Sequence, residues 1–249
     1  MVRQARNTSS SGVYHAMVRG INRQNIFESS QARERFIDVL AEVKSVSGFL
    51  LFGYCLMDNH VHLLVRIEDE PLATVFKRIG VRYVPWYNKK YGRCGPLFQG
   101  RYRSEAVEDE RYLLSVLRYI HQNPVKAGIC AKPEDYRWSS YADYAGKGDG
   151  IADADDILPL FSSIPSRQQD EFCEFMAAEG EGHLDVDSNT DALCKERMEK
   201  LYGVGSASQF QALPAGERDL NLGRLKAAGL SIRRIVRLTG VPFGVVRKA

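Results

Sequence analysis

The clearest hydrophobic pattern in the chain is a pair of apolar runs that flank a short polar turn. Residues 51–67 read LFGYCLMDNHVHLLVRI, with Asp58 and Asn59 between the two runs. Apolar runs of strand length joined by a two-residue polar turn are typical of a β-hairpin. We therefore expect a hairpin over residues 50–67.

The elements on either side follow from the same kind of pattern. Apolar residues at helical spacing and a serine cap predict helices, and short apolar runs predict strands. The expected elements are strands at 13–19 and 102–107 and helices at 29–46, from 72 onward, and from about 109 to near 124. Pro85 is expected to kink or break the second helix, because proline has no N–H group to donate and clashes with the preceding turn.

The order strand-helix-strand-strand-helix-strand, followed by another helix, is that of the split βαβ or ferredoxin-like fold. In this α+β arrangement the sheet is antiparallel and the helices pack on one face. We expect this domain to span residues 12–145.

The net charge of +3 conceals three blocks of different sign. Residues 1–145 hold 21 basic and 15 acidic side chains, residues 146–191 hold 2 and 12, and residues 192–249 hold 11 and 4. We interpret 146–191 as a solvated acidic connector that carries one or two helices, such as 167–178. The basic blocks are suited to binding a polyanion.

The segment 192–249 is predicted to be a small all-α region. Within it Gly229 ends one helix, Ser231 caps a second, and Gly240 makes the turn into a third. This spacing is that of a helix-turn-helix. Because the chain ends about seven residues after the turn, the last helix is expected to be a short DNA reader that contacts phosphate.

Composition argues against several other classes of protein. No apolar run approaches the ~20 residues of a membrane span, and the start of the chain, MVRQARNTSSSG, lacks the apolar core of a signal peptide. The five cysteines are scattered and form no CxxC pair, which argues against a disulfide framework or a cysteine zinc site. We expect a cytoplasmic protein with no membrane partner.

His60 and His62 are the first candidate functional residues. Residues i and i+2 of a strand point to the same face, so both imidazoles should project side by side. Neutral imidazoles ligate divalent ions such as Mg²⁺, Mn²⁺ or Zn²⁺. A hydrogen-bonded histidine pair without a metal is the alternative for so short a motif.

A block rich in cations and aromatic rings follows, and it contains no acidic residue between positions 71 and 104. Cations neutralise phosphates and aromatic rings stack on unpaired bases, so the block predicts nucleic-acid binding. Phe76 and Tyr83 fall on the apolar stripe of their helix and are expected in the core. The candidate DNA-binding residues are Lys77, Arg78, Arg82, Lys89, Lys90, Arg93, Arg101 and Arg103.

Tyr119 and Asn123 stand one turn apart near the end of the last predicted helix. Tyr119 is expected to have a half-buried ring and an outward hydroxyl, either as an amphipathic core residue or as a nucleophile toward a phosphodiester. Asn123 is either a third metal ligand or the cap of a short turn opened by Pro124. The residues alone leave these alternatives open.

Five blocks occur in the order YHAMVRGINRQNIF, GYCLMDNHVHLLV, GPLFQGRYRS, YLLSVLRYIHQNPVKAGIC and EDYRWSSYADY. Together, over about residues 13–145, they resemble the REP-associated tyrosine transposases, relatives of the single-tyrosine HUH transposases. The resemblance implies that His60 and His62 are the HUH metal pair and that Tyr119 is the nucleophile. It also implies that Asn123 completes a site for Mg²⁺ or Mn²⁺.

The same resemblance implies an activity. Members of the family cut single-stranded DNA near imperfect hairpins, the repetitive extragenic palindromes, and leave a 5′-phosphotyrosine link and a free 3′-OH that can rejoin strands. The resemblance therefore implies a place with the nucleoid and single-stranded or hairpin DNA as the partner. With one tyrosine per chain, two strand breaks would need two chains, as in a homodimer, or two sequential turnovers. The alternative is a non-catalytic protein that binds hairpin or promoter DNA on the same fold.

Two positions depart from the family pattern. Asp58 replaces the usual proline before the Asn-His pair, where its carboxylate either tunes the metal site or completes the turn. Pro85 interrupts a helix that is commonly continuous in relatives.

Overall fold

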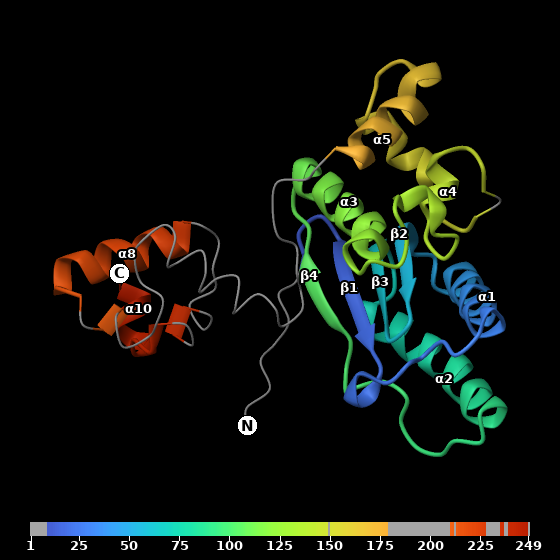
Figure 1. Cartoon of the computed structure of the whole chain (residues 1–249), viewed down its shortest axis with the longest axis horizontal. Helices are drawn as coiled ribbons and strands as arrows, with labels where there is room; N and C mark the ends of the chain where they lie inside the picture. The colour runs from blue at the N-terminus through green and yellow to red at the C-terminus, as the bar shows by residue number, and fades with distance from the viewer. Residues whose placement is uncertain are drawn as a thin grey trace. The chain divides into compact units, whose positions relative to one another are not determined.

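The computed structural model describes residues 9–148, 150–178, 210–211, 213–227, 235–236 and 239–248. The chain divides into two compact units, Met1–Gly182 and His183–Ala249. In Figure 1 the first unit runs from blue to yellow and contains the sheet, and the described parts of the second are orange to red.

The first unit is built on a four-stranded sheet. Its strand order is β2-β3-β1-β4, and every neighbouring pair is antiparallel. The strands are β1 (Val13–Arg19), β2 (Leu50–Met57), β3 (His60–Arg66) and β4 (Arg103–Ala106), and the helices packed with them are α1 (Ser30–Ser47), α2 (Leu72–Lys90) and α3 (Glu110–Lys126). The predicted antiparallel α+β fold is confirmed, including the hairpin β2–β3.

Side-chain caps account for the ends of two helices. The Ser29 side chain accepts a hydrogen bond from the Ala32 N–H at the start of α1, and Asp109 accepts from the Tyr112 N–H at the start of α3. Each cap satisfies an N–H group that has no partner within the helix. Gly48 ends α1 in the left-handed conformation, with φ of 67°, which glycine adopts without strain.

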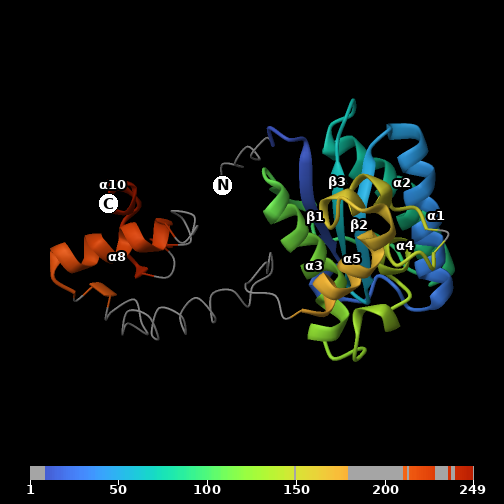
Figure 2. The same cartoon turned by 90° about the horizontal axis from the view of Figure 1, so that it is seen from above.

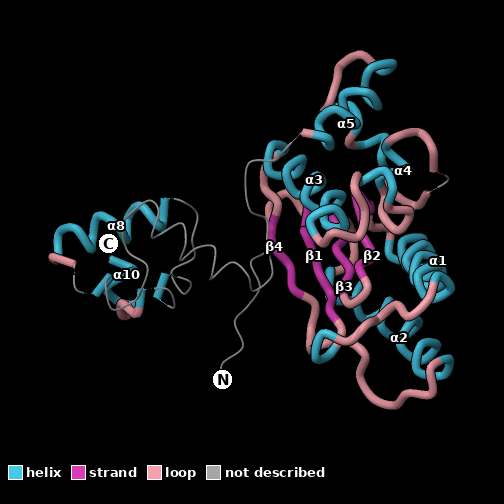
Figure 3. The backbone as a smooth tube through the Cα atoms, in the orientation of Figure 1, coloured by secondary structure: helices cyan, strands magenta, loops and turns pink. Residues whose placement is uncertain are grey.

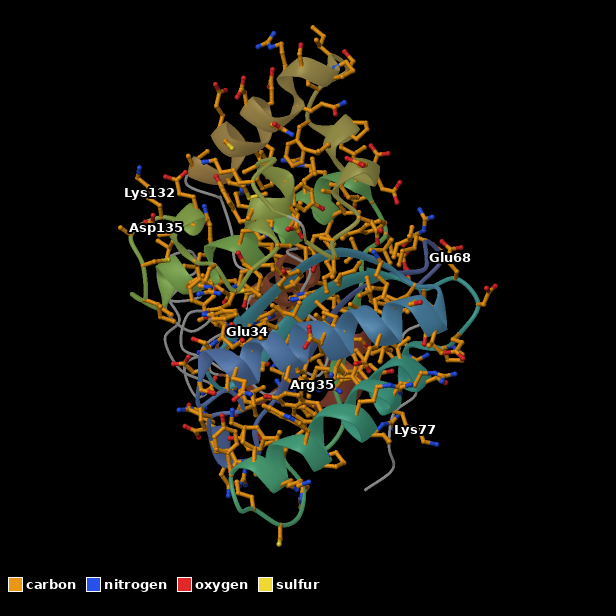
Figure 4. The ribbon with its side chains drawn as sticks, turned by 90° about the vertical axis from the view of Figure 1, so that its right-hand side faces the viewer. Glu34, Arg35, Glu68, Lys77, Lys132 and Asp135 are labelled. Atoms are coloured by element: carbon orange, nitrogen blue, oxygen red, sulfur yellow. The ribbon has the colours of Figure 1, made fainter. Side chains whose placement is uncertain are left out.

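Helices α1 and α2 cover one face of the sheet (Figures 2 and 4). Figure 4 looks onto these helices, with Arg35 on α1 and Lys77 on α2. Val61, Leu63 and Val65 of β3 point toward them and are fully buried. Burying one such side chain contributes about 1.5–3 kcal/mol, so this layer forms the main core.

Helix α3 lies on the opposite face, as Figures 1 and 3 show. A Cβ atom on Gly53 of β2 would lie 2.8 Å from Cδ1 of Leu117 in α3 and 3.8 Å from Cβ of Leu64 in β3. Gly53 therefore allows the helix to approach the sheet closely. The prediction that helices pack on one face holds for α1 and α2, and α3 is the exception.

Neither proline interrupts its helix. Helix α2 continues through Pro85 and α3 continues through Pro124, so the predicted break at residue 85 is wrong. Pro85 removes one hydrogen bond to the carbonyl four residues earlier. That carbonyl belongs to Val81, which is 63% exposed, so water can replace the lost donor.

Much of the acidic segment 146–191 is folded as part of the first unit. Asp153 accepts hydrogen bonds from Lys44 Nζ and from the Leu51 N–H, both at 2.7 Å. Gln122 of α3 donates to the Met176 carbonyl at 2.9 Å. The short elements here are η2 (Pro133–Asp135), α4 (Tyr141–Tyr144), η3 (Ala154–Asp156), η4 (Leu158–Leu160), η5 (Pro165–Arg167) and α5 (Gln168–Ala177). The helix expected at 167–178 is confirmed, but residues 150–177 are not a solvated connector.

The second unit is helical in its described parts. It contains α8 (Ala215–Ala227) and α10 (Phe243–Lys248), and its core includes Leu222, Leu225 and Val246. Gly240 has a φ of 66° and donates to the Val236 carbonyl, as expected at a turn. The predicted boundary residues Gly229 and Ser231 lie outside the described residues. None of the helices that the structure describes is long and apolar enough to cross a lipid bilayer.

Candidate metal and nucleophile site

Strand β3 brings His60 and His62 to the face of the sheet that α3 covers. Their ring centroids are 4.9 Å apart, as expected for alternate residues of one strand. In the neighbouring strand Arg19 pairs with His60 and Met17 with His62. Directly paired residues share a face, so His15, two residues from Met17, also joins this side of the sheet.

Each histidine of the pair uses its Nδ1 atom for a contact within the protein. Nδ1 of His60 lies 2.6 Å from Oδ1 of Asn59, and Nδ1 of His62 lies 3.0 Å from Nε2 of His15. Metal-ligating histidines usually engage their second nitrogen in this way. The Nε2 atoms of His60 and His62 are thus the ones to consider as metal ligands.

Burial keeps these imidazoles neutral. Burial, together with a smaller effect of the nearby Arg19 guanidinium, lowers the pKa of His60 to about 4. Burial also lowers the pKa of His62 well below its ordinary value, and His15, His60 and Arg19 act in the same direction. The neutral form is the one that ligates a metal ion.

Tyr119 of α3 lies over the histidines. The centroid of its ring is 5.5 Å from that of His62 and 5.7 Å from that of His15, both in edge-on geometry. The residue is 5% exposed, so the expectation of a half-buried ring is wrong. The ammonium group of Lys126 lies 5.2 Å from the centroid of the same ring. The structure therefore places the ring of Tyr119 beside the histidine pair and near the ammonium group of Lys126.

Asn123 lies one turn after Tyr119 on the same helix. Its Nδ2 donates to the Tyr119 carbonyl at 3.0 Å. Because Pro124 is inside α3, Asn123 does not cap a separate turn, and that alternative is wrong. Within the described ranges, no group of three His, Cys, Asp or Glu side chains could hold a metal ion. A third protein ligand would have to be of another type, and Asn123 stays the predicted one.

Comparisons with known proteins bear on the family of the region that carries this site. The family model for IS200-like transposases matches residues 8–123. The chain is also 29% identical, over 105 residues, to a putative REP-associated tyrosine transposase of Haemophilus influenzae. That match covers 37% of this chain and spans 59% of the relative's length.

A solved structure is similar in fold to this chain. It is described as a REP-associated tyrosine transposase bound to a REP hairpin. The likeness has a TM-score of 0.51 with 19% sequence identity, and covers 62% of this chain and 93% of the other. At this identity the likeness bears on the fold alone.

His15 and Arg19 were not among the predicted site residues. Both lie on β1 at positions that share a face, and only the pairing of β1 with β3 places them beside His60 and His62. Arg23 and Arg103 are close enough to lower the pKa of Arg19, after the larger effect of burial, and Tyr119 acts in the opposite direction. A period-two reading of the predicted strand 13–19 could have found His15 and Arg19 together.

The predicted basic block does not form one surface of the first unit. Arg103 lies on β4 and pairs with Met17, so it belongs to the face that bears the site. The candidates on α2 lie behind the sheet, on the other face. There Arg78 pairs with Glu70 at 2.6 Å and Arg82 with Glu42 at 3.6 Å. The block itself contains no acidic residue, but acidic residues from outside it pair with two of its arginines and neutralise their charge.

Two further candidates near this block contact amide groups. Arg93 donates to Gln24 Oε1 at 2.8 Å, and Lys90 donates to Gln31. Lys77, Lys89 and Arg101 are exposed, and a role for them in DNA binding stays a prediction.

The aromatic rings of the block belong to the core. Tyr83 and Tyr87 are fully buried and donate to the carbonyls of Ile26 and Asn25. The others pack against the same core, namely Phe76, Trp86, Tyr91, Phe98 and Tyr102. The prediction that Phe76 and Tyr83 belong to the core is confirmed. The aromatic rings that were expected to stack on bases also pack against this core.

Asp58 does not face the histidines. Its carboxylate pairs with Arg33 of α1, and its carbonyl accepts from the N–H groups of Ile26 and Phe27. Of the two roles considered, these contacts favour completion of the turn.

Proposed function

We propose that this chain is a metal-dependent tyrosine transposase that cuts and rejoins single-stranded DNA at hairpins of the repetitive extragenic palindrome type. The observation that carries the proposal is the placement of Tyr119 edge-on to His62 beside His60, within the region that the family model for IS200-like transposases matches. The relative from Haemophilus influenzae and the hairpin-bound solved structure support the choice of substrate.

The residues present fit a Mg²⁺ or Mn²⁺ ion. Each HUH histidine is neutral and holds its Nδ1 in a contact within the protein. Their Nε2 atoms, with the amide oxygen of Asn123, would be the ligands. An ion bound there would neutralise charge on the phosphate and stabilise the leaving oxygen.

Tyr119 carries the covalent step. Its phenolic oxygen attacks the phosphorus atom, the bond from phosphorus to the 3′-oxygen breaks, and the 3′-oxygen takes up a proton. The products are a 5′-phosphotyrosine link and a free 3′-OH. When a 3′-OH attacks that link, the phosphodiester is restored and the tyrosine is released.

Cations around Tyr119 support this chemistry. A tyrosine with a pKa near ~10 is a poor nucleophile at neutral pH, and positive charge nearby favours its ionised form. Arg19 and Lys126 both lie near Tyr119. Arg19 and Arg103 on the same face also offer positive charge to the phosphate of an incoming strand.

A covalent-adduct assay tests the proposal. Labelled single-stranded DNA carrying the palindromes that flank the gene is incubated with full-length protein and Mn²⁺, and an adduct that survives denaturation is expected. Tyr119→Phe and His60→Ala should abolish the adduct. Tyr141→Phe is the matched control, because Tyr141 is also 5% exposed. Tight hairpin binding without an adduct would instead favour a non-catalytic DNA-binding protein.

A further inference from the structure

His15 is a fully buried histidine that the proposed chemistry does not use. Its Nε2 lies 3.0 Å from Nδ1 of His62, and the two ring planes are inclined by only 25° with centroids 5.2 Å apart. It is 1% exposed, as is His62. Its own Nδ1 is buried, and no hydrogen-bond partner for that atom exists in the part of the chain that the structure describes.

The contact links the protonation of one ring to that of the other. A neutral imidazole carries one N–H group, on either Nδ1 or Nε2. If His15 donates from Nε2, then His62 accepts at Nδ1 and carries its own hydrogen on Nε2. In that state the Nε2 atom of His62 has no lone pair for a metal ion.

The opposite arrangement prepares His62 for a metal. When His62 donates from Nδ1 to Nε2 of His15, the lone pair of His62 is on its Nε2. The hydrogen of His15 is then on its Nδ1. We propose that His15 is a positioning residue that accepts the Nδ1–H of His62 and so presents Nε2 of His62 to a divalent ion. This inference rests on the proposed function, which supplies the ion.

His121 offers a matched control within the same unit. It is also fully buried, its Nε2 lies 2.8 Å from Oγ of Ser140, and its Nδ1 likewise has no partner among the described residues. It faces the aromatic rings of Tyr141, Tyr144 and Phe172 instead of the HUH pair. A substitution of His121 therefore removes a similarly buried imidazole and leaves the surroundings of His62 unchanged.

Calorimetric titration with Mn²⁺ tests the proposal on the full-length chain. In His15→Leu the new side chain fills a similar volume but cannot accept the hydrogen bond from His62. The variant should weaken Mn²⁺ binding by roughly 10–100-fold, as for other residues that orient a metal ligand. His15→Gln places an amide oxygen near the position of Nε2 and should restore most of the affinity. His121→Leu should bind as tightly as the wild type. Urea unfolding of each variant shows that it is folded.

The outcomes separate this inference from the proposed function. A wild-type protein that binds no Mn²⁺ would overturn the proposed function itself. Wild-type binding matched by a folded His15→Leu variant would overturn the role of His15 alone, as would equal losses in His15→Leu and His121→Leu. Long-range ¹H–¹⁵N spectra of the Mg²⁺-loaded protein should show the hydrogen of His62 on Nδ1. A hydrogen on Nε2 would contradict the proposal.

Discussion

The side chain of Asn59 connects His60 to the loop that follows β1. Its Oδ1 lies 2.6 Å from Nδ1 of His60, and its Nδ2 donates to the Arg23 carbonyl at 3.3 Å. Arg23 and its neighbour Asn22 both have positive φ angles, 60° and 51°, a conformation that costs energy in non-glycine residues. Asn59 thus holds a strained loop and a candidate metal ligand together.

Asn59→Ala should lower Mn²⁺ affinity by about tenfold, because the ring of His60 loses the acceptor that fixes its orientation. Isothermal titration calorimetry measures the change. Asp58→Ala is the matched control from the same turn. Its carboxylate pairs with Arg33, so the variant should lose at most about 1 kcal/mol of stability and no metal affinity. Weaker metal binding in Asp58→Ala would mean that Asp58 tunes the site after all.

Lys126 places an ammonium group 5.2 Å from the ring centroid of Tyr119. Lys126→Met keeps the aliphatic chain and removes the charge. Since a cation–π contact is worth about 0.5–2 kcal/mol, the rate of adduct formation should fall by about 2- to 30-fold. Single-turnover assays at saturating DNA measure this rate. Lys132→Met, which removes an exposed cation paired with Glu134, should leave the rate unchanged.

The two faces of the sheet predict different roles for the arginines of the basic block. Arg103→Gln should weaken binding to single-stranded DNA and reduce the slope of log affinity against log salt by about 0.7, the value for one lost phosphate contact. Arg78→Gln should leave that slope unchanged, because Arg78 pairs with Glu70 behind the sheet. Fluorescence anisotropy over a series of salt concentrations measures both. Equal losses in the two variants would show that DNA also contacts α2.

Local patterns predicted most of the fold. The strand at 13–19 matches β1, the serine cap marks the start of α1, and the two-residue turn joins β2 to β3. These features depend on residues close together in the chain. The predicted break at Pro85 was wrong because the sequence does not show that Val81, whose carbonyl loses its donor, is an exposed residue.

The site was less accessible to sequence reasoning because strand pairing assembles it. Residues 60 and 62 share a face by local geometry alone. His15 reaches His62 only through the antiparallel register of β1 with β3, across 47 positions of sequence. In the same way Glu70 and Glu42 approach Arg78 and Arg82 only in the folded chain, so an acid-free run in sequence gave no isolated basic surface.

His121 predicts a loss of stability in acid. Burial lowers its pKa in the folded protein from 6.5 to about 3. Between these values the unfolded chain binds a proton that the folded chain does not, so the free energy of unfolding falls as the pH falls. The contribution is fully present above pH 6.5 and is lost as the pH drops toward 3, by up to about 1.4 kcal/mol per pH unit. His121→Leu should therefore reduce the pH dependence of urea unfolding between pH 6.5 and 4.5, and the share of His15, His60 and His62 should remain. Ser115→Ala, on the same helix and without a titratable group, should keep the wild-type slope of unfolding free energy against pH. A wild-type slope in His121→Leu would mean that the neutral imidazole of His121 does not account for the acid sensitivity.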